Sequence, residues 1–139
     1  MKIVMVERNS VGTDIDVSCY ERFGEVVYYP QTTAEEAAEH IGDADIVISN
    51  KLLLNEQTLK ACPNVKLICN TATGFDNIDL NYCNKRGITV TNVRDYSTQS
   101  VAQHTFALLF YLLEKLKKYD EYVKSGQYME CESFSYFGY

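Results

Sequence analysis

Five short apolar runs, separated by helical patterns, constrain the fold of this chain more than any other feature. The runs are rich in Val and Ile and are continuous rather than alternating, as in strands that are buried on both faces of a sheet. Short links and helical patterns between them predict a parallel sheet with right-handed crossovers. We therefore predict an α/β fold with a five-stranded parallel sheet flanked by helices. The runs lie at residues 2–6, 25–29, 45–49, 66–70 and 88–93.

Local signals mark the ends of the predicted helices between these runs. Asn55 and Asp79 each precede a short helical pattern and are residue types that cap helix N-termini. Gly87 follows the second of these patterns, where a glycine commonly ends a helix. The chain therefore carries its own start and stop signals around the third, fourth and fifth runs.

The pattern changes after the fifth run. Ser100 with Gln103 resembles a capping box, and one long helix is predicted over 100–118. Residues 106–113 are apolar all round that helix, and packing against one domain would bury only one side of it. We therefore predict a homodimer through helix 100–118. The aromatic-rich segment 119–139 has no clear period and is predicted to lack a fold of its own.

Composition and charge exclude several functions. The net charge of −6 argues against nucleic acid and anionic membrane surfaces, because both require clustered Lys and Arg. The apolar run at 106–113 is well short of the ~20 residues of a membrane span. Two histidines do not build a metal site unaided, and the five cysteines form no C-x-x-C pair. These features predict a cytoplasmic protein with reduced thiols, no metal, and no membrane or nucleic-acid partner.

Polar residues follow the third and fourth runs, where a parallel sheet binds ligands. Asn50 and Lys51 come after the third run, and the turn at 71–76 comes after the fourth. Gly74 has no Cβ, so a ligand can approach the backbone closely, and successive N–H groups in such a turn form an anion nest. The sequence thus points to a small carboxylate bound at this edge.

A second interpretation of the same turn stays open from the residues alone. Gly74 can equally be a plain turn glycine, with Asp76 and Asn77 forming an Asx turn. A nucleotide phosphate is not predicted there, because neither G-x-G-x-x-G nor G-x-x-x-x-G-K-[ST] occurs in the chain.

Three motifs in fixed order resemble the D-isomer-specific 2-hydroxyacid dehydrogenases, in particular their glycerate dehydrogenase (hydroxypyruvate reductase) branch. They are ATGFDNIDL at 72–80, RGITVTN at 86–92 and YSTQSVAQHTFALL at 96–109. The resemblance covers nearly the whole chain. It implies a flavodoxin-like substrate-binding domain at 1–99, incomplete without a C-terminal return, and an interdomain and dimerisation segment at 100–139. A Rossmann domain that binds NAD or NADP would follow.

The resemblance also implies roles for individual residues. The backbone N–H groups of Thr73 and Gly74 would hold the carboxylate of a 2-oxo or 2-hydroxy acid, and Asn50 and Lys51 would border that substrate. The segment around Ser100 and Val101 would approach the nicotinamide. The full-length enzyme would interconvert a D-2-hydroxy acid and a 2-oxo acid.

The catalytic Arg, carboxylate and His of the family come later in its sequence order, and His104 matches none of them. We therefore expect no catalytic residue in this chain, no bound cofactor and no activity of the chain by itself. Arg94-Asp95 stand where Pro-Gly is commoner in the family, and Gln103 stands where Glu is common. The alternative is a stand-alone flavodoxin-like binding or interaction module that derives from such an enzyme.

Overall fold

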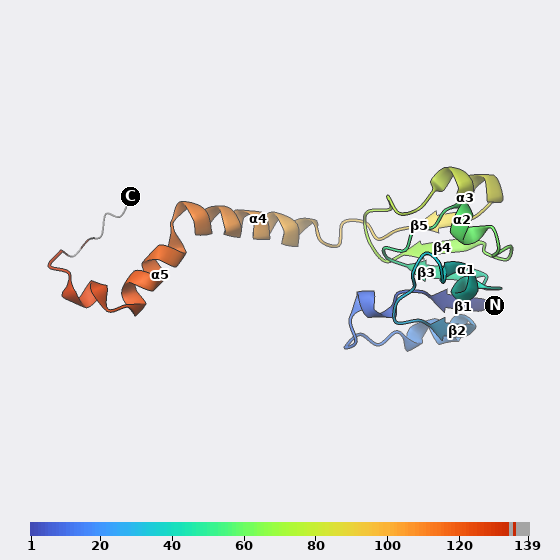
Figure 1. Cartoon of the computed structure of the whole chain (residues 1–139), viewed down its shortest axis with the longest axis horizontal. Helices are drawn as coiled ribbons and strands as arrows, with labels where there is room; N and C mark the ends of the chain where they lie inside the picture. The colour runs from blue at the N-terminus through green and yellow to red at the C-terminus, as the bar shows by residue number, and fades with distance from the viewer. Residues whose placement is uncertain (134, 136–139) are drawn as a thin grey trace. The chain divides into compact units, whose positions relative to one another are not determined.

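The computed structural model describes residues 1–133 and 135, and the chain forms two compact units, Met1–Asp95 and Tyr96–Tyr139. The first unit is built on a five-stranded parallel sheet in the order β2-β1-β3-β4-β5 (Figure 1). Each strand falls inside one of the predicted apolar runs, so the predicted α/β class is confirmed. The strands are β1 (Lys2–Met5), β2 (Glu25–Tyr28), β3 (Ile46–Ser49), β4 (Leu67–Asn70) and β5 (Thr89–Thr91).

The strand order decides which connections cover which face of the sheet. Because crossovers are right-handed, the β1–β2 connection lies on one face and the three later connections lie on the other. The later connections contain the helices α1 (Ala37–Ile41), α2 (Glu56–Leu59) and α3 (Leu80–Arg86), and the larger core packs beneath them. The β1–β2 connection contains only two 3-10 helices, η1 (Arg8–Val11) and η2 (Ser18–Phe23).

The face beneath η1 and η2 is only partly covered within the first unit. Val11 and Tyr20 pack on a small core formed by β1 and β3. Beyond them lies an open, mainly apolar groove of about 420 Å³, lined by residues that include Ile46, Leu67 and Cys69. Continuous apolar runs are typical of parallel sheets that are covered on both faces. Within the first unit, this groove leaves part of one face of the sheet uncovered.

The predicted helix signals around α2 and α3 are confirmed. The Asn55 side-chain oxygen accepts hydrogen bonds from the N–H groups of Gln57 (2.9 Å) and Thr58 (3.3 Å) at the start of α2. Asp79 caps α3 by accepting from the Tyr82 N–H at 2.9 Å. Gly87 ends α3 with a left-handed φ of 71°. These bonds satisfy N–H and C=O groups that a helix end otherwise leaves unpaired.

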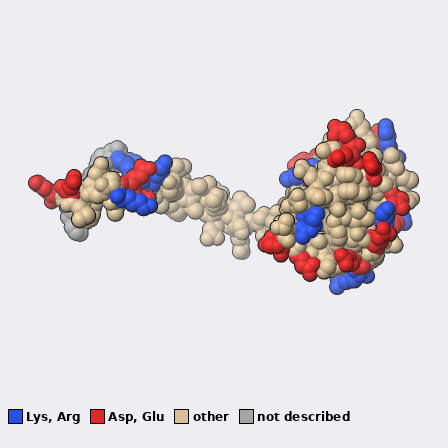
Figure 2. Space-filling model, turned by 60° about the horizontal axis from the view of Figure 1, so that its bottom comes forward, with Lys and Arg blue, Asp and Glu red and all other residues tan. Residues whose placement is uncertain are grey.

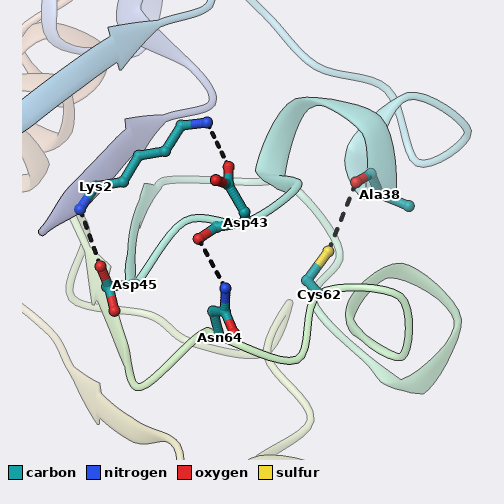
Figure 3. Close-up of polar contacts among 6 residues, drawn as sticks. All are labelled: Lys2, Ala38, Asp43, Asp45, Cys62 and Asn64. Atoms are coloured by element: carbon teal, nitrogen blue, oxygen red, sulfur yellow. Dashed lines mark hydrogen bonds and ion pairs between the residues drawn. The ribbon is translucent and has the colours of Figure 1, made fainter.

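Ion pairs and hydrogen bonds close the amino-terminal edge of the sheet (Figure 3). The Lys2 backbone N–H donates to the Asp45 carboxylate at 2.9 Å, and the Lys2 ammonium pairs with Asp43. The Asn64 side-chain amide donates to the Asp43 carbonyl at 3.3 Å. The loops that lead into β3 and β4 are thus tied to the start of β1, and the polar groups drawn at this edge bond to one another.

The cysteines differ in their exposure. Cys62 and Cys83 are buried free thiols in the larger core, and burial raises the pKa of both. The Cys62 thiol lies 3.6 Å from the Ala38 carbonyl oxygen (Figure 3). Cys19 lies in η2, which contains no buried residue, and is exposed.

The second unit contains two helices where one was predicted. The helix expected over 100–118 divides into α4 (Thr98–Leu113) and α5 (Leu116–Lys124). Lys115 has a left-handed φ of 50°, and its N–H bonds to the Leu112 carbonyl, which closes the last turn of α4. No Gly or Pro marks this break, so the residue pattern contains no sign of it.

Both ends of that prediction also need correction. Helical bonding starts at Ser97, whose carbonyl accepts the Val101 N–H at 2.8 Å, so α4 begins before the predicted capping box at Ser100. Within the segment that was predicted to lack a fold of its own, α5 runs to Lys124 and η3 (Gln127–Glu130) follows. The tail aromatics Phe134, Tyr136, Phe137 and Tyr139 lie outside the described residues.

The side chains of α4 are exposed along its whole length. None of its residues is buried, and Leu109 and Leu112 are 45% and 71% exposed. The helix carries no Lys, Arg, Asp or Glu and is uniformly tan in Figure 2. Across the part of the chain that the structure describes, no helix has both the length and the apolar character that a bilayer span requires.

Candidate functional site

The loops that follow β3 and β4 lie against each other at the carboxyl edge of the sheet. The Thr71 N–H and hydroxyl both donate to the Ser49 carbonyl, at 2.8 and 3.2 Å. The Asn77 side-chain amide donates to the Leu52 carbonyl at 2.9 Å. These bonds bring the candidate residues of both loops to the same edge of the first unit, as the parallel topology requires.

Glu7, which lies two residues after β1, holds the loop after β3, and the sequence alone predicts no role for it. Its carboxylate accepts from the backbone N–H groups of Asn50, Lys51 and Leu52 at 2.7, 2.9 and 3.0 Å. The Ser49 hydroxyl donates to the same carboxylate at 2.9 Å. Partial burial acts to raise the pKa of Glu7, and these four donors outweigh it, so the pKa lies below its ordinary value.

The side chains of Asn50 and Lys51 are polar and bond to no other group in the described part of the chain. Asn50 is half-buried and Lys51 is exposed. Their backbone N–H groups are taken by Glu7, whereas the Asn50 amide and the Lys51 ammonium form no hydrogen bond or ion pair within residues 1–133 and 135. An amide and a cation are therefore left available at this edge.

The Thr73-Gly74 turn is fixed through its oxygen atoms. The Asn70 side-chain amide donates to the Gly74 carbonyl at 2.6 Å, and the Asn92 amide donates to the Thr73 carbonyl at 2.8 Å. The Thr73 hydroxyl donates to the Val93 carbonyl at 2.9 Å. Among the described residues, no acceptor is bonded to the N–H of Thr73 or Gly74. The turn therefore holds two backbone donors in a fixed loop.

The conformation of Gly74 bears on why a glycine stands there. Its φ is not positive, so the backbone does not require glycine. A Cβ at this position would lie 3.7 Å from the Asp76 carboxylate, an ordinary contact. The predicted Asx turn is not formed within the described residues, because no backbone N–H bonds to the Asp76 side chain and the Asn77 amide donates to the Leu52 carbonyl. The missing side chain leaves room beside the turn, bounded by the Asp76 carboxylate.

Asn70 stabilises the turn through its amide group, but its buried side-chain oxygen has no hydrogen-bond partner in the described part of the chain. It is 2% exposed, and its Oδ1 has no hydrogen-bond donor within the described residues. A buried acceptor without a partner costs about 1–3 kcal/mol. The amide of Asn70 is thus committed to the Gly74 carbonyl even though its oxygen remains unsatisfied.

Ser100 and Val101, predicted to approach a cofactor, belong to the second unit. Both lie in the first turn of α4 and are exposed, Val101 by 61%. The N-cap residue Ser97 makes no side-chain cap, so the first N–H groups of this helix are not satisfied by it. That turn also contains no acidic residue. Within the described residues, no group of His, Cys, Asp and Glu is placed to hold a metal ion.

Comparison with known proteins gives a consistent result. A family model described as "D-isomer specific 2-hydroxyacid dehydrogenase, catalytic domain" matches residues 3–134. The hydroxypyruvate reductase of Blautia hydrogenotrophica is 32% identical over the whole of this chain, which covers 44% of that protein. The glycerate dehydrogenase of Methylorubrum extorquens is 34% identical over 99% of this chain and 44% of its own length.

A solved structure extends the similarity to the fold. The D-lactate dehydrogenase of Aquifex aeolicus, complexed with NAD and lactic acid, superposes with a TM-score of 0.75 and 29% identity. The match covers 99% of this chain and 39% of the dehydrogenase chain. The chain thus spans less than half the length of each of these relatives.

Proposed function

Since the chain belongs to the D-isomer-specific 2-hydroxyacid dehydrogenase family, we propose that it forms the substrate-binding part of an NAD(P)-dependent oxidoreductase. The proposed reaction interconverts a D-2-hydroxy acid and a 2-oxo acid of the glycerate and hydroxypyruvate type. The relatives named glycerate dehydrogenase and hydroxypyruvate reductase, which match over nearly all of this chain, support that substrate class.

The Thr73-Gly74 turn carries the proposal. Its two N–H groups have no acceptor in the described part of the chain, and its carbonyls are held by Asn70 and Asn92. Backbone donors of this kind form charge-assisted hydrogen bonds with a carboxylate. Asn50 and Lys51, on the neighbouring loop, would border the same acid, where the ammonium favours an anion. We thus assign the carboxylate of the substrate to the Thr73-Gly74 turn. The other polar atoms of the substrate are assigned to the loop with Asn50 and Lys51.

The first turn of α4 fits the proposed cofactor. A bound nicotinamide would supply or accept the hydride of the reaction. Ser100 and Val101 offer a hydroxyl and an apolar surface beside uncapped N–H groups, and no charged side chain lies in that turn. Residues 1–139 contain no G-x-G-x-x-G motif, so we assign the main dinucleotide contacts to a Rossmann domain. We expect this chain by itself to bind the acid and to show no NADH oxidation with hydroxypyruvate.

Two further features are proposed for the whole protein. In a domain based on residues 1–99, a C-terminal return would cover the apolar groove beside Ile46 and Leu67. The segment 100–118 would form a homodimer, supported by the exposed apolar side chains of α4. Closed two-fold contacts are the commonest way in which identical chains bury such a surface.

The alternative is a stand-alone binding module. It is favoured by the turn, because all the residues that hold Thr73 and Gly74 lie within the first unit. Either function requires the turn to bind a carboxylate, and only the enzyme requires hydride transfer. A polypeptide in which a Rossmann domain follows residue 139 and which oxidises NADH with hydroxypyruvate would exclude the module.

Titration of the ¹⁵N-labelled chain with hydroxypyruvate tests the binding site. We expect saturable shifts of the Thr73 and Gly74 amide signals. Dihydroxyacetone is the matched control, because it keeps the ketone and the hydroxyl and lacks the carboxylate. If hydroxypyruvate leaves both amides unchanged, or if dihydroxyacetone shifts them equally, the turn does not recognise the carboxylate.

A further inference from the structure

We propose that Glu7 is a positioning residue whose carboxylate fills an anion nest in the loop after β3 and thereby leaves the Thr73-Gly74 turn as the site for the acid. This inference rests on the proposed function for the identity of the acid. The existence of the nest does not depend on that function, because the nest consists of the donors that surround Glu7.

The donors around Glu7 form a nest in the structural sense. Three successive backbone N–H groups, those of Asn50, Lys51 and Leu52, converge on one carboxylate oxygen at 2.7–3.0 Å. The Ser49 hydroxyl adds a fourth donor to the same oxygen. Successive N–H groups that point at one anion are the arrangement by which loops bind phosphates and carboxylates. Here the anion is a side chain of the protein.

Glu7 is itself anchored to the sheet. The N–H of Val6, the residue before it, donates to the Ile48 carbonyl at 3.0 Å, which continues the pairing of β1 with β3. The Glu7 carbonyl accepts from the N–H and the hydroxyl of Ser10, at 3.0 and 2.7 Å. The carboxylate is therefore held from a central strand, and it fixes the backbone of the loop relative to that strand.

Two consequences follow for a carboxylate ligand. Glu7 fills the backbone donors at Asn50 to Leu52, whereas the N–H groups of Thr73 and Gly74 have no acceptor among the described residues, so a small acid finds the latter unbonded. The bonds from Glu7 also fix the backbone from which the Asn50 and Lys51 side chains extend. Glu7 thus acts through its neighbours rather than by touching the substrate.

The experiment removes the internal anion and offers an external one. In ¹⁵N-labelled Glu7→Ala, formate should shift the Asn50, Lys51 and Leu52 amide signals saturably, whereas the wild-type signals should not respond. Without formate, hydroxypyruvate should bind the Thr73-Gly74 turn of the variant about tenfold more weakly, as followed by those two amide signals, because the neighbouring loop is no longer held. Glu56→Ala, which removes an exposed carboxylate from the first turn of α2, is the matched control and should change neither result.

Each outcome decides a separate part of the inference. If formate does not shift the three amides in Glu7→Ala, or shifts them equally in the wild type, no nest exists. If formate shifts them in the variant but hydroxypyruvate binds as in the wild type, the positioning role is wrong. If the wild type does not bind hydroxypyruvate, the proposed function fails, and the formate titration still decides the nest.

A second variant covers the case in which Glu7→Ala does not fold. Glu7→Gln keeps the size of the side chain and replaces one acceptor oxygen by a donor amide. Hydrogen exchange at Asn50, Lys51 and Leu52 should accelerate in this variant relative to the wild type. Exchange at β5 should stay the same. Equal exchange rates at the three loop amides in both proteins would overturn the inference.

Discussion

Replacing Gly74 with valine separates binding from folding at the candidate site. The φ of Gly74 is not positive, and a Cβ there would meet the Asp76 carboxylate only at 3.7 Å. The turn should therefore accept the substitution with a change in unfolding free energy within about 0.5 kcal/mol, as for an ordinary surface site. The valine side chain would instead occupy the space beside the Thr73 and Gly74 N–H groups.

The loss of affinity follows from the hydrogen bonds at stake. A hydrogen bond to a charged group contributes about 1.5–3 kcal/mol, and about 1.4 kcal/mol corresponds to a tenfold change in Kd. Even one lost bond should therefore raise the Kd for hydroxypyruvate about tenfold or more. Isothermal titration calorimetry of the 139-residue chain measures the Kd, and thermal unfolding measures the stability.

Gly87→Ala is the matched control, because it should show the opposite pattern. Gly87 has a φ of 71°, and no atom lies within 4 Å of the position that a Cβ would take, so the cost comes from the backbone alone. A left-handed residue with a side chain costs about 1–2 kcal/mol. This variant should be less stable and bind hydroxypyruvate normally. If folded Gly74→Val keeps the wild-type Kd, Gly74 is a plain turn residue and the carboxylate assignment is wrong.

Three further predictions concern other parts of the chain. Leu109→Glu should convert the chain from a dimer to a monomer in light scattering, while the control Leu53→Glu, on an exposed side chain of the first unit, should not; a monomeric wild type at high micromolar concentration would refute the α4 interface. Because the pKa of Glu7 is lowered on folding, its stabilisation is present above about pH 4.5 and is lost as the pH falls through the lower folded value. Acid unfolding of Glu7→Gln should accordingly depend less steeply on pH in that range, and identical slopes would contradict the assignment. Asn55→Ala should lower the free energy of urea unfolding by about 1 kcal/mol through loss of the α2 cap, a result that an unchanged midpoint would exclude.

The sheet could be predicted from the sequence because its evidence is local. Continuous Val/Ile runs identify strands wherever they pair, although the edge strands β2 and β5 contain no buried residue, and Asn55 and Asp79 cap the helices that directly follow them. The division between α4 and α5 escaped prediction because it rests on the left-handed backbone of Lys115, a residue type without a preference for that conformation.

The candidate site divides in the same way. The positions of Asn50, Lys51, Thr73 and Gly74 follow from the rule that parallel strands carry ligands at their carboxyl ends. Glu7 directly follows the first apolar run, but its four donors lie 42 to 45 residues further along the chain. No local pattern connects a carboxylate with donors at that separation, so its role required the folded structure.

The separation of these contacts along the chain also sets an order of assembly during synthesis. Glu7 and all its donors are contained in residues 1–52, whereas the Thr73-Gly74 turn is held by Asn92 and Val93. Because the N-terminus of a chain leaves the ribosome first, Glu7 can bond to the loop after β3 about forty residues before Asn92 and Val93 are available to hold the Thr73-Gly74 turn. On the ribosome, the nest would receive its internal carboxylate before a binding turn exists, and a metabolite acid would meet only the second set of donors.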